Sequence, residues 1–80
     1  MSSEPLEIDA RGLMCPLPLL RLKKALVSVE VGERVRILAT DPAARLDFGV
    51  FLEQAGHLQI TCEEHGEWLC FVIEKGPKTS

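Results

Sequence analysis

The chain has few of the residues that define several common protein classes. Its 80 residues include three cysteines, with no Cys-x-x-Cys pair and no Cys/His spacing typical of a structural zinc site. An odd number of cysteines in a chain without an export signal disfavours a disulfide framework. We therefore expect free thiols, no metal and no organic cofactor.

Excess positive charge and long apolar runs are also missing. The formal net charge is −3, whereas nucleic-acid-binding domains usually concentrate basic residues on one face. No apolar run in the sequence approaches the roughly 20 residues of a membrane-spanning helix. Residues 1–5 lack the basic and apolar regions of a signal peptide. We expect a cytoplasmic monomer that contacts neither membrane nor nucleic acid directly.

Apolar residues, by contrast, are plentiful enough for one compact core. They make up 46% of the chain, and the length fits a single domain. A chain this short buries only about 60% of its unfolded surface, so the core has to be efficient. We expect one domain over residues 1–80, with residues 1–4 and 77–80 flexible.

The first half of that domain is predicted to contain a strand and a helix. Alternating polarity from Leu6 to Arg11 predicts a half-buried strand, and Gly12 ends it with a backbone that turns freely. A helix follows over roughly residues 16–29. Its apolar stripe consists of Leu19, Leu22, Ala25, Leu26 and Val29.

A second strand and helix follow. The strand is expected over residues 34–39, with alternate residues facing the core. Asp41 is the predicted N-cap of the helix and Pro42 its first residue, while Gly56 is the expected left-handed stop. The apolar face of this helix consists of Ala44, Phe48, Phe51, Leu52 and Ala55.

Two strands, over residues 58–63 and 68–73, complete the prediction as a hairpin. A two-residue turn at His65-Gly66 would pair Cys62 with Leu69 and direct Cys62 and Ile60 toward the core. Cys70 would then face the other way, beside Trp68, as an idle surface thiol or a second redox site. Cysteines on opposite faces cannot form a disulfide. A three-residue loop, the alternative, would place both cysteines on one face.

The element order β-α-β-α-β-β predicts the fold class. Two crossover helices imply parallel pairing of the first strands, and right-handed crossovers place both helices on the same side. We expect an α+β two-layer sandwich, a four-stranded mixed sheet with two helices on one face. The uncovered face is expected to carry Glu7, Asp9, Arg11, Arg34, Arg36 and Leu38.

Cys15 is the candidate functional residue, because it lies at a predicted helix start. Unpaired N–H groups and the positive end of the helix dipole stabilise an anion there, so the pKa of the thiol is expected to fall below its ordinary value. Pro16 and Pro18 fix this turn but remove two N–H donors. Arg11 is expected either to add positive charge near the thiolate or to remain an exposed strand residue.

Asp41 is expected at the same edge of the sheet as Cys15, because the carboxyl ends of adjacent parallel strands lie together. It is either a plain helix cap or part of the site. A lone thiol at an anion-favouring edge suits a nucleophile or a sulfur carrier. No histidine lies near either loop in the sequence, so a Cys-His hydrolase has no evident base.

Five segments of the chain carry a family resemblance. They are Asp9-Ala10-Arg11-Gly12-Leu13-Met14-Cys15-Pro16-Leu17-Pro18, Ala39-Thr40-Asp41-Pro42-Ala43, Asp47-Phe48 with Phe51, Gly56-His57, and Ile73-Glu74-Lys75-Gly76. Together they make residues 6–75 similar to the TusA/SirA family of small sulfur-relay proteins. The most specific of them is the Cys-Pro-x-Pro motif after a strand and a glycine.

The resemblance implies a sulfurtransferase that carries sulfane sulfur as a persulfide on Cys15. The donor would be a cysteine desulfurase or a rhodanese-like protein, and the sulfur would pass to an acceptor protein. Transfer RNA thiolation, molybdenum-cofactor sulfuration and sulfur oxidation are the candidate pathways. The expected supporting residues are Arg11, Gly12, Met14, Pro16, Pro18 and Asp41.

A non-catalytic binding or regulatory module is the second hypothesis. Arg34 and Arg36 on the open sheet face would serve RNA binding, and Trp68, Cys70 and Val72 would serve protein docking. The acidic net charge and the lack of an aromatic ladder disfavour RNA.

Overall fold

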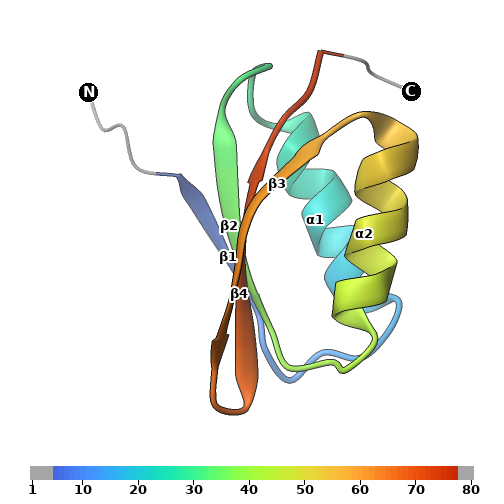
Figure 1. Cartoon of the computed structure of the whole chain (residues 1–80), viewed down its shortest axis with the longest axis vertical. Helices are drawn as coiled ribbons and strands as arrows, with labels where there is room; N and C mark the ends of the chain where they lie inside the picture. Colours follow the sequence, from blue (N-terminus) through green and yellow to red (C-terminus); the bar gives the residue numbers. More distant parts are fainter. Residues whose placement is uncertain (1–4, 78–80) are drawn as a thin grey trace.

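The computed structural model describes residues 5–77 as a helical layer against a sheet (Figure 1). The elements in chain order are β1 (Leu6–Ala10), α1 (Leu17–Val27), β2 (Arg34–Ala39), α2 (Ala44–Ala55), β3 (Leu58–His65) and β4 (Trp68–Glu74). The predictions for residues 1–4 and 78–80 lie outside the described residues, and Pro77 is exposed.

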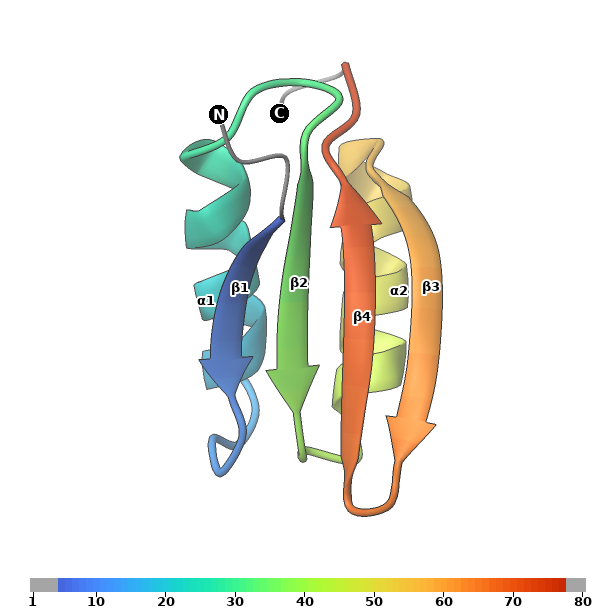
Figure 2. The ribbon, with the colours of Figure 1, turned by 90° about the vertical axis from the view of Figure 1, so that its left-hand side faces the viewer.

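The strands form one mixed sheet in the order β1-β2-β4-β3. Strands β1 and β2 are parallel, and β4 runs antiparallel to both of its neighbours. Both helices cover the same face, as the two perpendicular views show (Figures 1 and 2). The predicted two-layer α+β sandwich is therefore confirmed.

The core lies between this sheet and the two helices. In α1 the buried residues are Pro18, Leu22, Ala25 and Leu26, which includes most of the predicted stripe. Phe48 of α2 packs edge-on against Phe71 of β4, with ring centroids 4.8 Å apart, and both rings are fully buried. This contact fastens α2 to the middle of the sheet.

Helix α2 begins two residues later than predicted. The residue that precedes it is Ala43, so the prediction of Asp41 as its N-cap is wrong in position. The Asp41 carboxylate nevertheless accepts a hydrogen bond from the Ala43 N–H at 3.0 Å, as a capping side chain does. Gly56 has a φ of 82°, which confirms the left-handed stop.

The β3–β4 hairpin has a different register from the predicted one. Its two turn residues are Gly66 and Glu67, and His65 is the last residue of β3 rather than part of the turn. Gly66 has a φ of 69° at the first central position, as a type II′ turn requires. Cys62 therefore pairs with Phe71 instead of Leu69. Because the partner moves by two positions, Cys62 still faces the core.

Ile60 does not face the core as predicted. The pairing of β3 shifts between Gln59 and Thr61, and Ile60 is the extra residue of this bulge. Its side chain is 38% exposed and lines the uncovered face of the sheet. The alternation of residues predicted for this strand is broken at that point.

The uncovered face forms an open groove of about 600 Å³. Leu38 and Cys70 are opposite each other at its base and are only 7% and 9% exposed. Trp68 stacks on His65 nearby, with centroids 4.4 Å apart. The expectation that Leu38 and Cys70 are surface residues is thus wrong, although both lie on the predicted face. Burial also raises the pKa of the Cys70 thiol.

Among the described residues, neither α1 nor α2 has the length and apolar character needed to cross a bilayer.

A hydrogen bond holds the segment after β4. The Gly76 N–H donates to His57 Nδ1 at 2.9 Å. His57 thus anchors the segment that follows β4.

Candidate functional site

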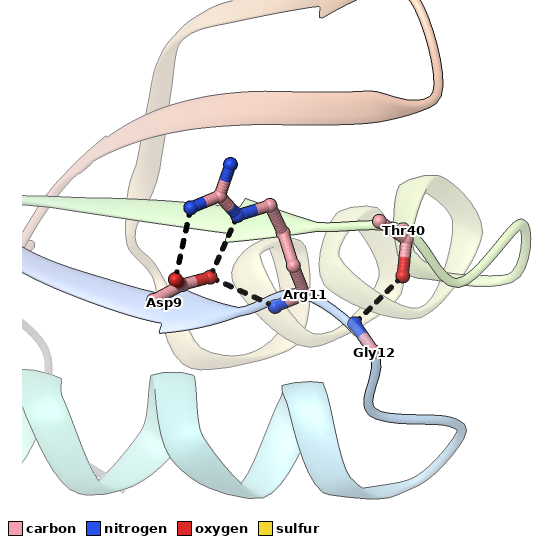
Figure 3. Close-up of polar contacts among 4 residues, drawn as sticks. All are labelled: Asp9, Arg11, Gly12 and Thr40. Atoms are coloured by element: carbon pink, nitrogen blue, oxygen red, sulfur yellow. Dashed lines mark hydrogen bonds and ion pairs between the residues drawn. The ribbon is translucent and has the colours of Figure 1, made fainter.

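The site is built on the two loops that follow β1 and β2. Both loops lie at the same end of the molecule, next to the β3–β4 turn (Figure 2). The Gly12 N–H donates a hydrogen bond to Thr40 Oγ1 at 2.9 Å and so joins them (Figure 3). Gly12 has a φ of 82°, a conformation that glycine adopts without strain.

Cys15 is exposed in the first of these loops, two residues before α1. The Leu17 N–H donates to the Met14 carbonyl at 2.9 Å, which closes the turn that carries the thiol. Pro16 is the residue that precedes the helix, joined to Cys15 by a cis peptide bond, and Pro18 is buried in the first turn. Met14 is exposed beside the thiol.

Three acidic groups converge at this edge. The Cys15 Sγ and carboxylate oxygens of Asp41 and Asp47 all lie within 4.8 Å of one another. Asp41 comes from the loop after β2, and Asp47 from the first turn of α2. The predicted proximity of Asp41 to Cys15 is therefore present, together with a second carboxylate that sequence reasoning did not assign to the site.

These carboxylates reverse the expected shift of the thiol. The pKa of Cys15 is raised, chiefly by the hydrogen bond between the thiol and Asp47. Partial desolvation and the negative charges of Asp47 and Asp41 raise the pKa of Cys15 further. The prediction of a lowered pKa is wrong, because the hydrogen bond to Asp47 and the charges of both carboxylates raise the pKa instead.

Asp41 is the most deeply buried member of the cluster. Asp41 is 3% exposed, and its Oδ2 has no hydrogen-bond partner among the described residues. Its Oδ1 accepts the bond from Ala43. One oxygen of this carboxylate is thus fixed by the backbone, whereas the other is buried and unsatisfied.

Arg11 lies on the other face of the sheet. Its guanidinium donates to Asp9 at 2.9 and 3.0 Å (Figure 3) and lies over the Trp68 ring, 5.2 Å from the centroid. This pairing lowers the pKa of Asp9 to about 2. Arg11 is not among the groups that shift the pKa of Cys15. The interpretation of Arg11 as a thiolate-stabilising charge is therefore corrected. Arg11 is exposed, as its alternative predicted, but it lies in the turn directly after β1 rather than in the strand.

A sequence signal for Asp47 existed. It precedes Phe48, whose predicted core position fixes the rotation of the helix, and it lies in the first turn of a helix predicted to start at the site edge. Asp47 also belongs to one of the segments that carry the family resemblance. In the sequence, Asp47-Phe48 indicates only the family resemblance and not a role at the site.

The two helices that follow the Cys15 and Asp41 loops carry exposed apolar side chains. They are Leu17, Leu20 and Val27 of α1, and Leu46 and Val50 of α2. A separate hollow of about 320 Å³ is lined by residues such as Leu26, Phe51 and Lys75, and it includes no member of the cysteine cluster. The thiol is thus presented on a surface rather than inside a cavity.

Comparison with known proteins agrees with this arrangement. The family described as Sulfurtransferase TusA matches residues 6–75. The sulfur carrier protein TusA of Allochromatium vinosum is 42% identical over 69 residues, which cover 86% of this chain and 91% of that protein.

A solved structure is also similar to this chain. The crystal structure of a SirA-like protein from Desulfitobacterium hafniense superposes with a TM-score of 0.78 at 30% identity, covering 89% of this chain and 97% of that one. With the family match over almost the whole domain, these similarities show that the chain belongs to the TusA/SirA family of sulfur-relay proteins.

Proposed function

We propose that the chain carries sulfane sulfur as a persulfide on Cys15, received from a cysteine desulfurase or a rhodanese-like donor and delivered to an acceptor protein. The observation that supports this most is exposure. Of the three cysteines, all within the described range, Cys15 is exposed, Cys62 is half-buried and Cys70 is buried. Two proteins have to reach the carrier sulfur in turn, and Cys15 is the accessible one.

The transfer takes two displacements at sulfur. The Cys15 thiolate attacks the outer sulfur of the donor persulfide, the donor cysteine leaves as a thiolate, and Cys15-S-SH forms. An acceptor thiolate then attacks that outer sulfur, and Cys15 leaves as a thiolate. The sulfur moves between thiols without net oxidation, so the exchange needs no external electron acceptor.

Asp47 opposes loss of the thiol proton in the free carrier. Its hydrogen bond to the Cys15 thiol and its negative charge both raise the pKa of Cys15. The proton of the thiol passes to solvent when Cys15 becomes a nucleophile. A raised pKa also slows departure of Cys15 as a thiolate, so both steps become faster when the charge of the neighbouring carboxylates is neutralised.

The raised pKa also makes Cys15 less reactive in the free protein than in a complex with a partner that lowers the pKa. Near neutral pH a thiol of raised pKa is mostly protonated, and the thiolate is the form that reacts. A partner that brings positive charge to Asp41 and Asp47 would lower the pKa of Cys15 on docking. Activation then depends on the correct donor or acceptor being bound.

The pathway is proposed only by class. Transfer RNA thiolation, molybdenum-cofactor sulfuration and sulfur oxidation all need a carrier thiol of this kind. We place the relay in the cytoplasm, where thiols stay reduced, in keeping with three free cysteines.

Sulfur loading of defined variants tests the proposal. The protein is incubated with a cysteine desulfurase and cysteine in buffer containing a chelator, and its intact mass is measured before and after reduction. We expect a reducible gain of one sulfur atom in the wild type, Cys62→Ser and Cys70→Ser proteins, and none in Cys15→Ser. A Cys15→Ser protein that still gains and delivers sulfur would overturn the proposal.

The open sheet face offers less support for an RNA-binding module. Arg34 pairs with Glu74 at 3.2 Å and Arg36 with Glu7 at 3.5 Å, so both cations have carboxylate partners. Salt-dependent RNA binding that is unaffected by Cys15→Ser would favour this alternative over a sulfur carrier.

A further inference from the structure

We propose that Cys15, Asp41 and Asp47 form a binding site for one zinc ion, and that zinc and sulfur compete for Cys15. The three side chains come from separate parts of the chain, so no ligand spacing in the sequence announces the site. In the fold their ligand atoms lie within 4.8 Å of one another. One carboxylate oxygen at this site is buried and has no hydrogen-bond partner among the described residues.

Asp41 Oδ2 is this unpartnered oxygen. It is buried, and no group in the described part of the chain donates a hydrogen bond to it. A buried polar atom without a partner destabilises the fold, so this arrangement favours a ligand that satisfies the atom. The Ala43 N–H holds Oδ1 at 3.0 Å and thereby fixes the orientation of Oδ2, as outer hydrogen bonds commonly do for metal-binding carboxylates.

The charge of the cluster is also uncompensated. Within residues 5–77, the ion pairs of the structure involve Asp9, Glu74, Glu7, Glu64 and Glu63, and none involves Asp41 or Asp47. Two carboxylates and a thiol therefore share a small volume without a basic side chain. A cation bound between them would neutralise this charge and favour the thiolate.

The ligand set selects the kind of cation. Magnesium and calcium prefer oxygen ligands alone, whereas zinc accepts thiolate and carboxylate together. Three protein ligands would leave a fourth position open to solvent. Zinc–ligand bonds of about 2.3 Å to sulfur and 2.1 Å to oxygen place tetrahedral ligand atoms roughly 3.4–3.6 Å apart. The ligand atoms now lie within 4.8 Å of one another, so the largest separation has to contract by at most about 1.4 Å.

Binding is a simple exchange of a proton for the ion. Zinc displaces the proton of the Cys15 thiol to solvent, and no electrons are transferred. Coordination engages one lone pair of the thiolate and lowers its nucleophilicity, so zinc-bound Cys15 attacks a donor persulfide more slowly than the free thiolate does. This competition rests on the proposed function of Cys15, whereas zinc binding itself does not.

Zinc binding is measured by competition with a chromophoric chelator, using the full chain stripped of metal. We expect one zinc per chain and an affinity at least about tenfold weaker in Asp47→Asn, Asp41→Asn and Cys15→Ser, since even loss of an outer-shell partner costs 10–100-fold. Cys70→Ser and Glu63→Gln serve as matched controls and should bind as tightly as the wild type. Cobalt substitution should give a thiolate-to-metal charge-transfer band that Cys15→Ser lacks.

Two results would overturn the site. Zinc affinity unchanged in both aspartate variants would mean that an exposed thiol alone binds the metal, and affinity unchanged in Cys15→Ser would place the metal elsewhere. Circular dichroism verifies that each variant is folded, and the less buried Asp47 carries the test if Asp41→Asn is unfolded. Sulfur loading in chelator-containing buffer is scored separately, so either proposal can fail without the other.

Discussion

The backbone amide of Gly12 and the hydroxyl of Thr40 are joined by a 2.9 Å hydrogen bond across 28 residues of sequence. This bond links the Cys15 loop to the loop that carries Asp41. The two strands before these loops are already paired in parallel, so the bond sets how their ends meet.

Replacement of Thr40 by valine tests this link. We expect Thr40→Val to lower the free energy of unfolding by about 0.5–1.5 kcal/mol, the usual net contribution of one hydrogen bond. Urea denaturation measures it. Thr61→Val is the matched control, because Thr61 is exposed on β3 and its hydroxyl bonds to no other described residue. Equal effects of the two substitutions would contradict a role for the Thr40 hydroxyl.

Asp47→Asn should make Cys15 more reactive near neutral pH. The substitution removes the negative charge that raises the pKa of the thiol, and the neutral amide oxygen of asparagine is a weaker hydrogen-bond acceptor than a carboxylate. Each unit by which the pKa falls increases the thiolate fraction roughly tenfold below the pKa. The pH profile of alkylation by iodoacetamide measures the change. Glu53→Gln, which alters an exposed acid of the same helix, should leave the profile in place. A profile unmoved by Asp47→Asn would contradict the geometry of the cluster.

Acid stability should depend on the Asp9–Arg11 pair. The folded-state pKa of Asp9 is about 2, below its ordinary value of 3.8, so the pair stabilises the fold above about pH 4. This contribution is lost as the pH falls through 2. Asp9→Asn should therefore flatten the loss of stability between these pH values, as measured by thermal unfolding. An unchanged acid limb in Asp9→Asn would show that the pair adds nothing.

Two glycines should respond oppositely to alanine. A Cβ on Gly76 would overlap the backbone carbonyl of Gly56, so Gly76→Ala should destabilise the protein by about 1–3 kcal/mol. Gly49 lies within α2 with open space around it, and Gly49→Ala should stabilise by about 0.5–1 kcal/mol. Denaturation midpoints compare the two variants directly. A Gly76→Ala protein as stable as the wild type would refute the close approach after β4.

The sequence predicted the layers of this fold because their causes are local. Apolar spacing defined α1, and parallel pairing implied that Cys15 and Asp41 share an edge. The direction in which the pKa of Cys15 shifts was not predictable in the same way. It depends on how Asp47 is rotated toward Cys15 when α2 packs. The helix terminus was visible in the sequence, whereas the opposing charges became evident only in three dimensions.

The hairpin shows a second kind of limit. Gly66 was recognised as a turn residue, but its exact position in the turn decides the register, and one position changes every pair. The predicted sheet faces of Cys62 and Cys70 are nevertheless correct, because the pairing partner of each residue moved by an even number of positions. The burial of Cys70 was not predicted, because it depends on how side chains from three strands pack around the thiol.

The separation of the cysteines has a consequence for the cargo. A persulfide next to a second accessible thiol forms an intramolecular disulfide and releases hydrogen sulfide. Here Cys15 is exposed, whereas Cys62 is half-buried and Cys70 is buried, and these two point to opposite faces of the sheet. If Cys15 carries a persulfide, as proposed above, burial restricts the access of both other thiols to it, and the sulfur would leave chiefly when another protein removes it.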